Sequence, residues 1–188
     1  QILERVYKLF VEELKNYDKE MFNFVDYVSL LDVITTKSFV SKTENYCKPT
    51  IIKKSKSYFD AKDLVHPILN HIANETYIPN DVCLGDENNG MLIYGTNGVG
   101  KSSINKSIGI AVIMAQSGMF VPASSFIYYP YDAIFTRIIG NDNLFKNLST
   151  FAVEMSECSS IINMSDENSL ILGDEVCSGT ENRSASSI

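Results

Sequence analysis

The stretch MLIYGTNGVGKSSINKSIGIAVIMA, residues 91–115, decides how the fold of this chain is interpreted. The letters at 95–102, GTNGVGKS, have the spacing G-x-x-x-x-G-K-[ST] of a phosphate-binding loop. Residues 91–94 are apolar, and helical periodicity runs from 102 to 116 after the loop. The sequence therefore predicts a strand at 91–94, a phosphate-binding loop and a helix in succession. The alternative is a glycine-rich turn without a ligand.

The residue types in this loop suit a polyphosphate. Gly95, Gly98 and Gly100 let the backbone curl so that successive N–H groups point into one concavity, where the N-terminus of the next helix also attracts anions. We expect the Lys101 ammonium to reach the β- and γ-phosphates and the Ser102 hydroxyl to bind Mg²⁺. The loop by itself predicts a site for a nucleoside triphosphate.

A second stretch, SLILGDE at 169–175, ends an apolar strand in two carboxylates, as a Walker B element does. We expect Asp174 to hold Mg²⁺ through water beside Ser102, and Glu175 to polarise the attacking water as general base. Strands often end in acidic turns, so this stretch alone also fits a purely structural turn. In a parallel sheet the carboxyl ends of the strands share one edge, which would bring both carboxylates next to the phosphate loop.

The composition is that of a folded protein with one main domain. Of the 188 residues, 45% are apolar and 21% charged, which allows a sizeable core and a small appendage. The longest apolar run, 108–115, is too short to span a bilayer, and the N-terminus shows no targeting pattern. We therefore expect a soluble intracellular protein without membrane partners, in a compartment that the sequence does not distinguish.

Charge and cysteine usage exclude two further kinds of site. The net charge of −7 leaves no general electrostatic footprint for nucleic acid, so we expect DNA contacts mostly from outside this chain. The four cysteines are scattered and lack ligand spacing, which favours reduced thiols over a zinc site or disulfides.

Two helices are expected before the phosphate-binding part. Residues 2–17 are amphipathic, and residues 21–40 are apolar over more than half of the helix circumference, which predicts a packed helical hairpin. A polar linker containing Pro49 follows, so we place a domain boundary there and predict domains at 1–45 and 46–188.

The rest of the chain alternates short strands and loops. The patterns predict strands at 50–52, 120–123 and 133–138, an extended segment at 77–82, a polar turn at 86–90, a loop at 141–148, and a helix from Ser149 or Thr150 to about 163. His66 directly precedes Pro67, and no partner residues cluster with it, so we expect a structural residue rather than a ligand or a base.

Taken in order, several strings resemble the ATPase domain of MutS-type DNA mismatch repair proteins: HP at 66–67, YIPND at 77–81, GTNGVGKS at 95–102, FVPA at 120–123, FTR at 135–137, STFAVEM at 149–155 and DE at 174–175. The resemblance covers about residues 64–180 and keeps motif order and spacing. Its most diagnostic part is STFAVEM. Within the family the chain looks closest to a divergent branch known from large DNA viruses and an organellar genome.

The resemblance implies an α/β fold, a P-loop NTPase similar to ABC-type ATPases, in which two protomers close over two ATP molecules with Mg²⁺. The second subunit is expected to be another copy of the same protein. Tyr77 matches the aromatic residue that stacks on adenine, with Ile78 beside it. Ser149 and Thr150 match the residues that open the helix facing the partner's γ-phosphate. Without the resemblance, Tyr77 fits a packing role and Ser149 an ordinary N-cap.

The chain also departs from the family pattern. The loop is usually GPNMGGKST, and here four variable places hold Thr96, Gly98, Val99 and Ser103. Asn97 is kept, and we count Asn97, Gly98 and Ser103 among the predicted nucleotide-binding residues. After Glu175 the usual GRGT run keeps only its final Gly and Thr, so that loop's subunit contacts are not carried over.

The resemblance further implies that the chain is a piece of a longer protein. Residues 1–45 correspond to a helical connector at the end of the lever and core region, and residues 46–188 to an ATPase domain truncated at its C-terminus. The domains that read mismatched DNA are expected before this chain, and the dimerisation helices after it.

The leading hypothesis is an ATPase module that couples Mg²⁺-ATP binding and hydrolysis to mismatch recognition, with Lys101 and Glu175 as catalytic residues. One alternative is an ABC-type ATPase of transport or chromosome maintenance, which would need an LSGGQ motif that NLSTF at 147–151 does not supply. Another is a non-enzymatic, nucleotide-dependent dimerisation module, against which Asp174 and Glu175 argue. If the nucleotide site is completed by a partner, the isolated piece is expected to be inactive.

Overall fold

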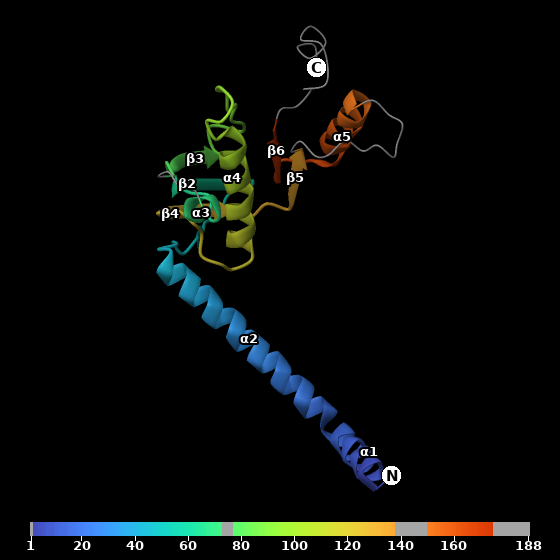
Figure 1. The fold of residues 1–188 in the computed structure, drawn as a ribbon. Helices are drawn as coiled ribbons and strands as arrows, with labels where there is room; N and C mark the ends of the chain where they lie inside the picture. The colour runs from blue at the N-terminus through green and yellow to red at the C-terminus, as the bar shows by residue number, and fades with distance from the viewer. Residues whose placement is uncertain (1, 73–76, 138–149, 175–188) are drawn as a thin grey trace. The chain divides into compact units, whose positions relative to one another are not determined.

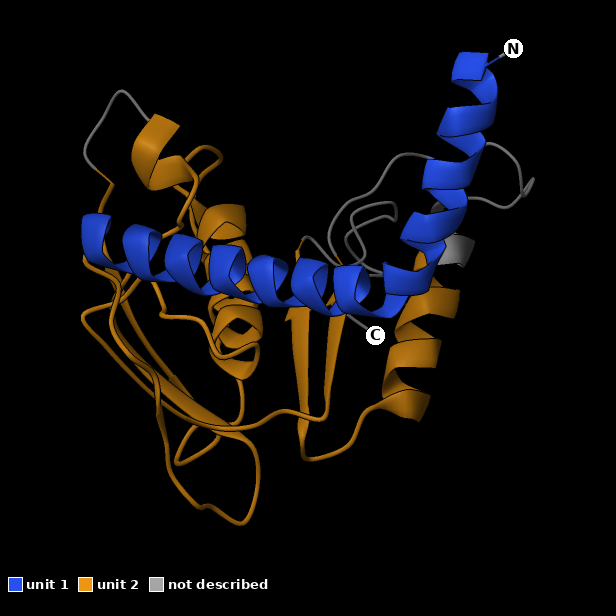
Figure 2. Ribbon diagram, turned by 90° about the horizontal axis from the view of Figure 1, so that it is seen from below, with its two compact units in different colours: residues 1–44 blue, residues 45–188 orange. Residues whose placement is uncertain are grey.

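The computed structural model describes residues 2–72, 77–137 and 150–174. Ser149 and Glu175 lie outside the described residues, as do the predicted loop at 141–148, Cys177 and the Gly and Thr that follow Glu175. The chain divides into two compact units, residues 1–44 and 45–188, drawn in two colours in Figure 2. The assignment of these units to a connector and an ATPase domain stays a prediction.

The first unit is helical from end to end. It consists of α1 (Ile2–Leu14), a single 3-10 turn η1 (Lys15–Tyr17) and α2 (Asp18–Thr43). Asp18 and Glu20 lie in the first turn of α2, where carboxylates stabilise a helix N-terminus. The helix therefore begins at Asp18 rather than near Met21, where the apolar pattern starts.

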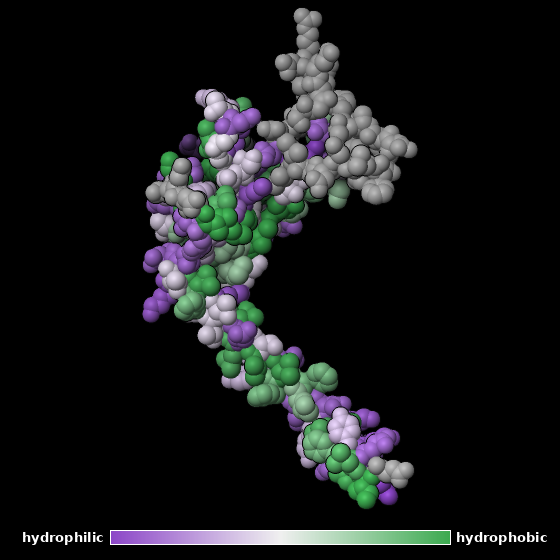
Figure 3. Space-filling model, in the orientation of Figure 1, coloured by the Kyte–Doolittle hydropathy of each residue, from purple (hydrophilic) through white to green (hydrophobic). Residues whose placement is uncertain are grey.

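The predicted packed hairpin of these two helices is wrong. Neither α1 nor α2 has a buried residue, and Figure 3 shows apolar side chains on their outer surface. The physical reason lies at 15–17: Lys-Asn-Tyr contains no glycine or proline, and both Leu14 and Asp18 keep right-handed helical angles. The backbone passes from one helix into the next without the reversal that a hairpin needs (Figure 2).

The second unit contains a four-stranded sheet in the order β1-β4-β2-β3. Its strands are β1 (Thr50–Ile51), β2 (Tyr58–Leu64), β3 (Asn80–Leu84) and β4 (Ser125–Tyr129), and β4 runs parallel to β1 and antiparallel to β2. β2 and β3 form an antiparallel pair with a bulge at Asp63, whose φ of 51° breaks the regular register. The strand predicted at 50–52 is confirmed, whereas β2 was not predicted.

A separate parallel pair, β5 (Ala133–Arg137) and β6 (Ser169–Gly173), runs in register from Ala133 beside Ser169 to Arg137 beside Gly173. Both strands lie where the sequence predicts them, and so do the helices α4 (Lys101–Gln116) and α5 (Thr150–Met164). A short helix, α3 (Leu69–Ile72), completes the described elements of this unit.

Helix α4 lies between the four-stranded sheet and the β5–β6 pair (Figure 1). The Tyr128 hydroxyl of β4 donates to the Ala115 carbonyl on one side, and β6 contacts α4 on the other. The core contains Phe59 and Phe126, which stack with ring centroids 5.9 Å apart, together with an apolar face of α4: Ile108, Ala111, Val112 and Ala115.

The end of α4 follows from one glycine. Gly118 has a φ of 68°, and the Met119 N–H donates to the Met114 carbonyl at 2.9 Å, which is the pattern of a Schellman C-cap. The predicted end of this helix at residue 116 is confirmed.

Two predicted strands are wrong. Residues 91–94 form no ladder with any described residue, and the Leu92 and Tyr94 side chains are 88% and 89% exposed. That prediction rested on apolarity, which indicates a tendency to be buried but does not specify a hydrogen-bonding partner. The segment 120–123 has only an isolated bridge between Val121 and Cys47, because Pro122 has no N–H to donate to a ladder, and the regular strand begins at Ser125.

Candidate functional site

The loop between residues 95 and 100 is a tight turn in which Gly95, Gly98 and Gly100 all have positive φ. Gly98 and Gly100 adopt φ values of 86° and 96°, and a Cβ at either position would meet no atom within 4 Å. Glycine is therefore required there for backbone conformation and not for space. Gly100 is the N-cap of α4, and no side chain caps this end. The first N–H groups of α4 thus point into the turn without competition from a capping hydroxyl or carboxylate.

Lys101 folds back over this loop. Its Nζ donates to the Gly95 and Thr96 carbonyl oxygens, both at 2.9 Å, so the ammonium lies over the loop rather than extending into solvent. Ser102 and Ser103 follow in the first turn of α4 and are half-buried. A positive charge, open helix N–H groups and a hydroxyl therefore occur within one turn of chain, which is the donor set that a polyphosphate with Mg²⁺ requires.

Helix α4 packs directly against β6, the strand that Asp174 follows in the sequence. A Cβ at Gly109 would lie 2.7 Å from Leu172 Cδ1, so the absence of a side chain at Gly109 permits the close approach. Closer to the loop, the Asn105 Nδ2 donates to the Gly173 carbonyl at 2.7 Å. The helix that follows the phosphate loop is thereby fixed to the residue that precedes Asp174.

Asp174 is half-buried, and its N–H donates to the Arg137 carbonyl at 2.8 Å. Strand β6 pairs in parallel with β5, whereas residues 91–94 form no strand beside it, so the predicted common sheet edge of Asp174 and the phosphate loop stays a prediction. Of the residues predicted to act on Mg²⁺, Ser102 and Asp174 are connected through α4 and β6.

Tyr77 lies beside the same helix. Its hydroxyl is 3.4 Å from the Ser107 Oγ, and Ser107 in turn donates to the Ser103 carbonyl at 2.8 Å. The neighbouring Ile78 side chain is 79% exposed. Tyr77 therefore contacts α4 at Ser107, about two helical turns from the phosphate loop. Its stacking on adenine stays a prediction. Thr150 begins α5, and its side chain is not among those described.

A charged cluster joins β5 to α5, and it was not predicted from the sequence. Arg137 Nη2 contacts Glu154 Oε1 at 2.9 Å, and its Nε contacts Glu157 Oε2 at 2.9 Å. The Arg137 and Glu154 side chains are 14% and 7% exposed. Both residues belong to strings that support the family resemblance, FTR and STFAVEM. The sequence signal that could have predicted this contact is an arginine at the end of an apolar strand, together with a glutamate on an otherwise apolar helical turn.

His66 makes a structural contact, as expected. Its Nδ1 accepts from the Ile68 and Leu69 N–H groups at 3.2 and 3.3 Å and so caps α3. Burial lowers the pKa of His66 below its ordinary value, and the nearby Lys106 charge acts in the same direction.

Other candidates in the described part of the chain hold no site. Lys54 and Lys56, which belong to a basic group with Lys53, contact Asp86 and Asn89 at 3.1 and 2.7 Å, so both lysines hold the turn before the phosphate loop. The described residues include no metal-ligating cluster, and the described cysteines are free thiols. No described helix has the length and apolarity needed to cross a membrane.

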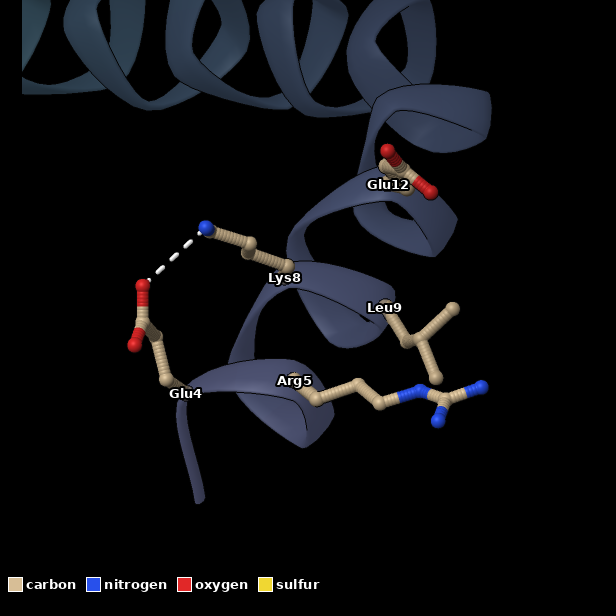
Figure 4. Close-up of a pocket in the computed structure, with 5 residues that line it drawn as sticks. All are labelled: Glu4, Arg5, Lys8, Leu9 and Glu12. Carbon is tan, nitrogen blue, oxygen red and sulfur yellow. Dashed lines mark hydrogen bonds and ion pairs between the residues drawn. The ribbon is translucent and has the colours of Figure 1, made fainter. Parts of the chain in front are cut away.

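A surface hollow in the first unit lies along α1 (Figure 4). It is lined by long side chains of this helix alone, Glu4, Arg5, Lys8, Leu9 and Glu12, and Lys8 contacts Glu4 at 3.1 Å across its rim. None of the predicted nucleotide-binding residues lines it. An i, i+4 ion pair on an exposed helix is an ordinary surface feature.

Comparison with known proteins gives a family match over the second half of the chain. The model of MutS domain V matches residues 91–188. This range begins at the apolar residues before the phosphate loop and includes α4, β4, β5, α5 and β6.

Curated relatives extend the similarity over the whole chain. A putative DNA mismatch repair protein mutS homolog of Acanthamoeba polyphaga mimivirus is 36% identical, and the mitochondrial DNA mismatch repair protein mutS homolog of Sarcophyton glaucum is 37% identical. The DNA mismatch repair protein MutS of Caldanaerobacter subterraneus is 35% identical. Each comparison covers 100% of this chain, which spans only 20–22% of the length of these relatives. Because the identities to viral, mitochondrial and bacterial proteins are nearly equal, the branch within the family stays a prediction.

Proposed function

The chain belongs to the MutS family, and from this premise we propose that residues 46–188 are the ATP-binding and ATP-hydrolysing part of a DNA mismatch repair protein. The proposal includes a P-loop fold of the ABC-ATPase type, with residues 1–45 as a helical connector. The observation that carries it is the start of α4, where Gly98 and Gly100 have positive φ, the helix N-terminus is uncapped and Lys101 lies over the loop.

The described residues fit Mg²⁺-ATP. The loop N–H groups from Gly95 to Gly100 and the Lys101 ammonium would hold the phosphates, with Asn97 and Ser103 at the loop and the first helical turn. Ser102 and Asp174 would hold Mg²⁺, an ion that prefers oxygen ligands and keeps several waters. Tyr77 and Ile78 would contact the adenine. Bound Mg²⁺ supplies charge stabilisation for phosphoryl transfer to water.

Hydrolysis is assigned to two residues with different tasks. Lys101 neutralises charge on the phosphates, and Glu175 accepts a proton from the attacking water. The hydrogen bond from α4 to the Gly173 carbonyl supports a shared site, since Lys101 begins this helix and Glu175 follows Gly173 by two residues in the sequence.

A partner subunit and DNA complete the proposed function. We assign Thr150, which begins α5, and Ser149, which precedes it in the sequence, to the γ-phosphate of a second subunit, because a helix N-terminus with hydroxyls suits an anion. Mismatched DNA would contact domains outside this chain, in keeping with the chain's net charge of −7. Family membership favours this function over an ABC-type transporter or chromosome-maintenance ATPase.

The test uses the full-length protein and separates binding from turnover. Lys101→Ala should abolish tight ATP binding, whereas Lys106→Ala, a matched change at an exposed position of the same helix, should leave it unchanged. Glu175→Gln should bind ATP normally and slow single-turnover hydrolysis by a factor of about 10² or more. Equal ATP affinity in wild type and Lys101→Ala would overturn the site. Equal hydrolysis in wild type and Glu175→Gln would overturn the assignment of Glu175 as the general base, and ATP binding without hydrolysis by the wild type would leave only a nucleotide-dependent dimerisation module.

A further inference from the structure

Asn105 is a polar residue in a mainly apolar contact. It lies one turn beyond Lys101 on α4, is only 9% exposed, and donates from Nδ2 to the Gly173 carbonyl at 2.7 Å. Burying an amide is unfavourable unless it is hydrogen-bonded, and the packing of α4 on β6 already has the close Gly109–Leu172 contact. The position therefore carries a polar residue that packing alone does not require.

The hydrogen bond acts on a single peptide group. The Gly173 carbonyl and the Asp174 N–H belong to the same planar unit, whose carbonyl accepts from Asn105 while its N–H donates to the Arg137 carbonyl at 2.8 Å. One bond comes from α4 and the other from β5, on opposite sides of β6. With both made, rotation of this plane is restricted, and so is the direction in which the chain enters Asp174.

We propose that Asn105 is a positioning residue that sets the separation of Ser102 and Asp174 and thereby the Mg²⁺ affinity of the nucleotide site. Ser102 and Asn105 are three residues apart on one helix and move together, so a bond from Asn105 to the residue before Asp174 fixes one Mg²⁺ ligand against the other. Small Mg²⁺ requires near-ideal ligand placement, and supporting hydrogen bonds commonly affect metal affinity strongly. The inference rests on the proposed nucleotide site.

The experiment measures Mg²⁺ dependence in the full-length protein. Binding of a fluorescent ATP analogue is followed by anisotropy, first in EDTA and then across a Mg²⁺ titration. Asn105→Ala should leave the affinity in EDTA within twofold of wild type and raise the half-saturating Mg²⁺ concentration about tenfold. Asn163→Ala, the same change at an exposed position on α5, should alter neither quantity. Asn105→Leu keeps the branched shape of the side chain without a donor and replaces the alanine variant if that variant does not fold.

The outcomes distinguish a failure of the positioning role of Asn105 from a failure of the proposed nucleotide site. A folded Asn105 variant with a Mg²⁺ requirement within twofold of wild type overturns the positioning role. So does an equal loss of affinity in EDTA and in Mg²⁺, because that result would place the effect in the phosphate loop. If the wild type binds the analogue in neither condition, the proposed nucleotide site itself is wrong.

Discussion

The cluster of Arg137, Glu154 and Glu157 predicts a graded effect on the attachment of α5. Arg137→Met removes the cation and leaves the Glu154 carboxylate, 7% exposed, without the guanidinium 2.9 Å away. Removing one member of a buried ion pair costs about 3–5 kcal/mol, since the remaining charge stays desolvated. Glu154→Gln keeps the shape and a neutral acceptor, and Arg137 retains its contact with Glu157, so the cost should be about 1.5–3 kcal/mol.

Glu157→Gln provides the matched control. It makes the same chemical change one turn away on α5 at a side chain that is 51% exposed, where screening limits an ion pair to about 0–1 kcal/mol. The expected order of destabilisation is therefore Arg137→Met, then Glu154→Gln, then Glu157→Gln. The double variant Arg137→Met with Glu154→Leu should recover much of the loss, because no buried charge then remains.

The assay is amide hydrogen exchange of α5 in the full-length protein, which reports the free energy of local opening without requiring two-state unfolding. Protection over Met155–Met164 should fall in the predicted order, while protection in β2 and β4 changes little. Equal losses for Glu154→Gln and Glu157→Gln, or full protection in Arg137→Met, would refute the view that a buried ion pair holds this helix.

Three further predictions follow from the described geometry. Because burial lowers the pKa of His66 from its ordinary 6.5, the unfolded chain binds a proton at higher pH than the folded chain does. The stabilising contribution of neutral His66 is complete above about pH 6.5 and is lost as the pH falls through the lowered pKa, so His66→Gln should flatten the dependence of the melting temperature on pH below 6.5. Gly98→Ala should weaken ATP binding about tenfold through strain at a φ of 86°, whereas Gly90→Ala, with equally open surroundings and no positive φ, should bind as wild type. Gly109→Val should destabilise the α4–β6 contact by about 1–3 kcal/mol, seen as reduced exchange protection in β6, because its Cβ would lie 2.7 Å from Leu172 Cδ1.

Local signals account for what the sequence predicted well. The helix α4 has a positive-φ glycine at each end and a small, apolar buried face, and β6 is an apolar run followed by a carboxylate, so each could be recognised from its own residues. The strand at 91–94 and the helical hairpin failed because both depend on what a segment packs against. Apolarity at Leu92 or along α2 does not identify a partner.

The contacts that organise the candidate site join residues far apart in the sequence, and they could therefore not be predicted from local sequence patterns. Asn105 and Gly173 are 68 residues apart, and Arg137 and Glu154 are 17 apart across residues that include the predicted 141–148 loop. Nothing near Asn105 in the sequence indicates a bond to a strand end. For Arg137 and Glu154, opposite charges in apolar surroundings were visible, but their pairing required the parallel register of β5 and β6.

Arg137 takes part in two contacts that have different consequences. Its side chain binds α5, and its carbonyl accepts from the Asp174 N–H at 2.8 Å, so a shift of α5 that moves Arg137 also moves the peptide group before Asp174. Asn105 holds the same peptide group from α4, a helix other than the one that Arg137 binds. We therefore expect Arg137→Met to reduce α5 protection and to raise the Mg²⁺ requirement together, whereas Asn105→Ala should raise the Mg²⁺ requirement alone. A change in the Mg²⁺ requirement confined to Asn105→Ala would mean that α5 and Asp174 are independent despite their shared residue.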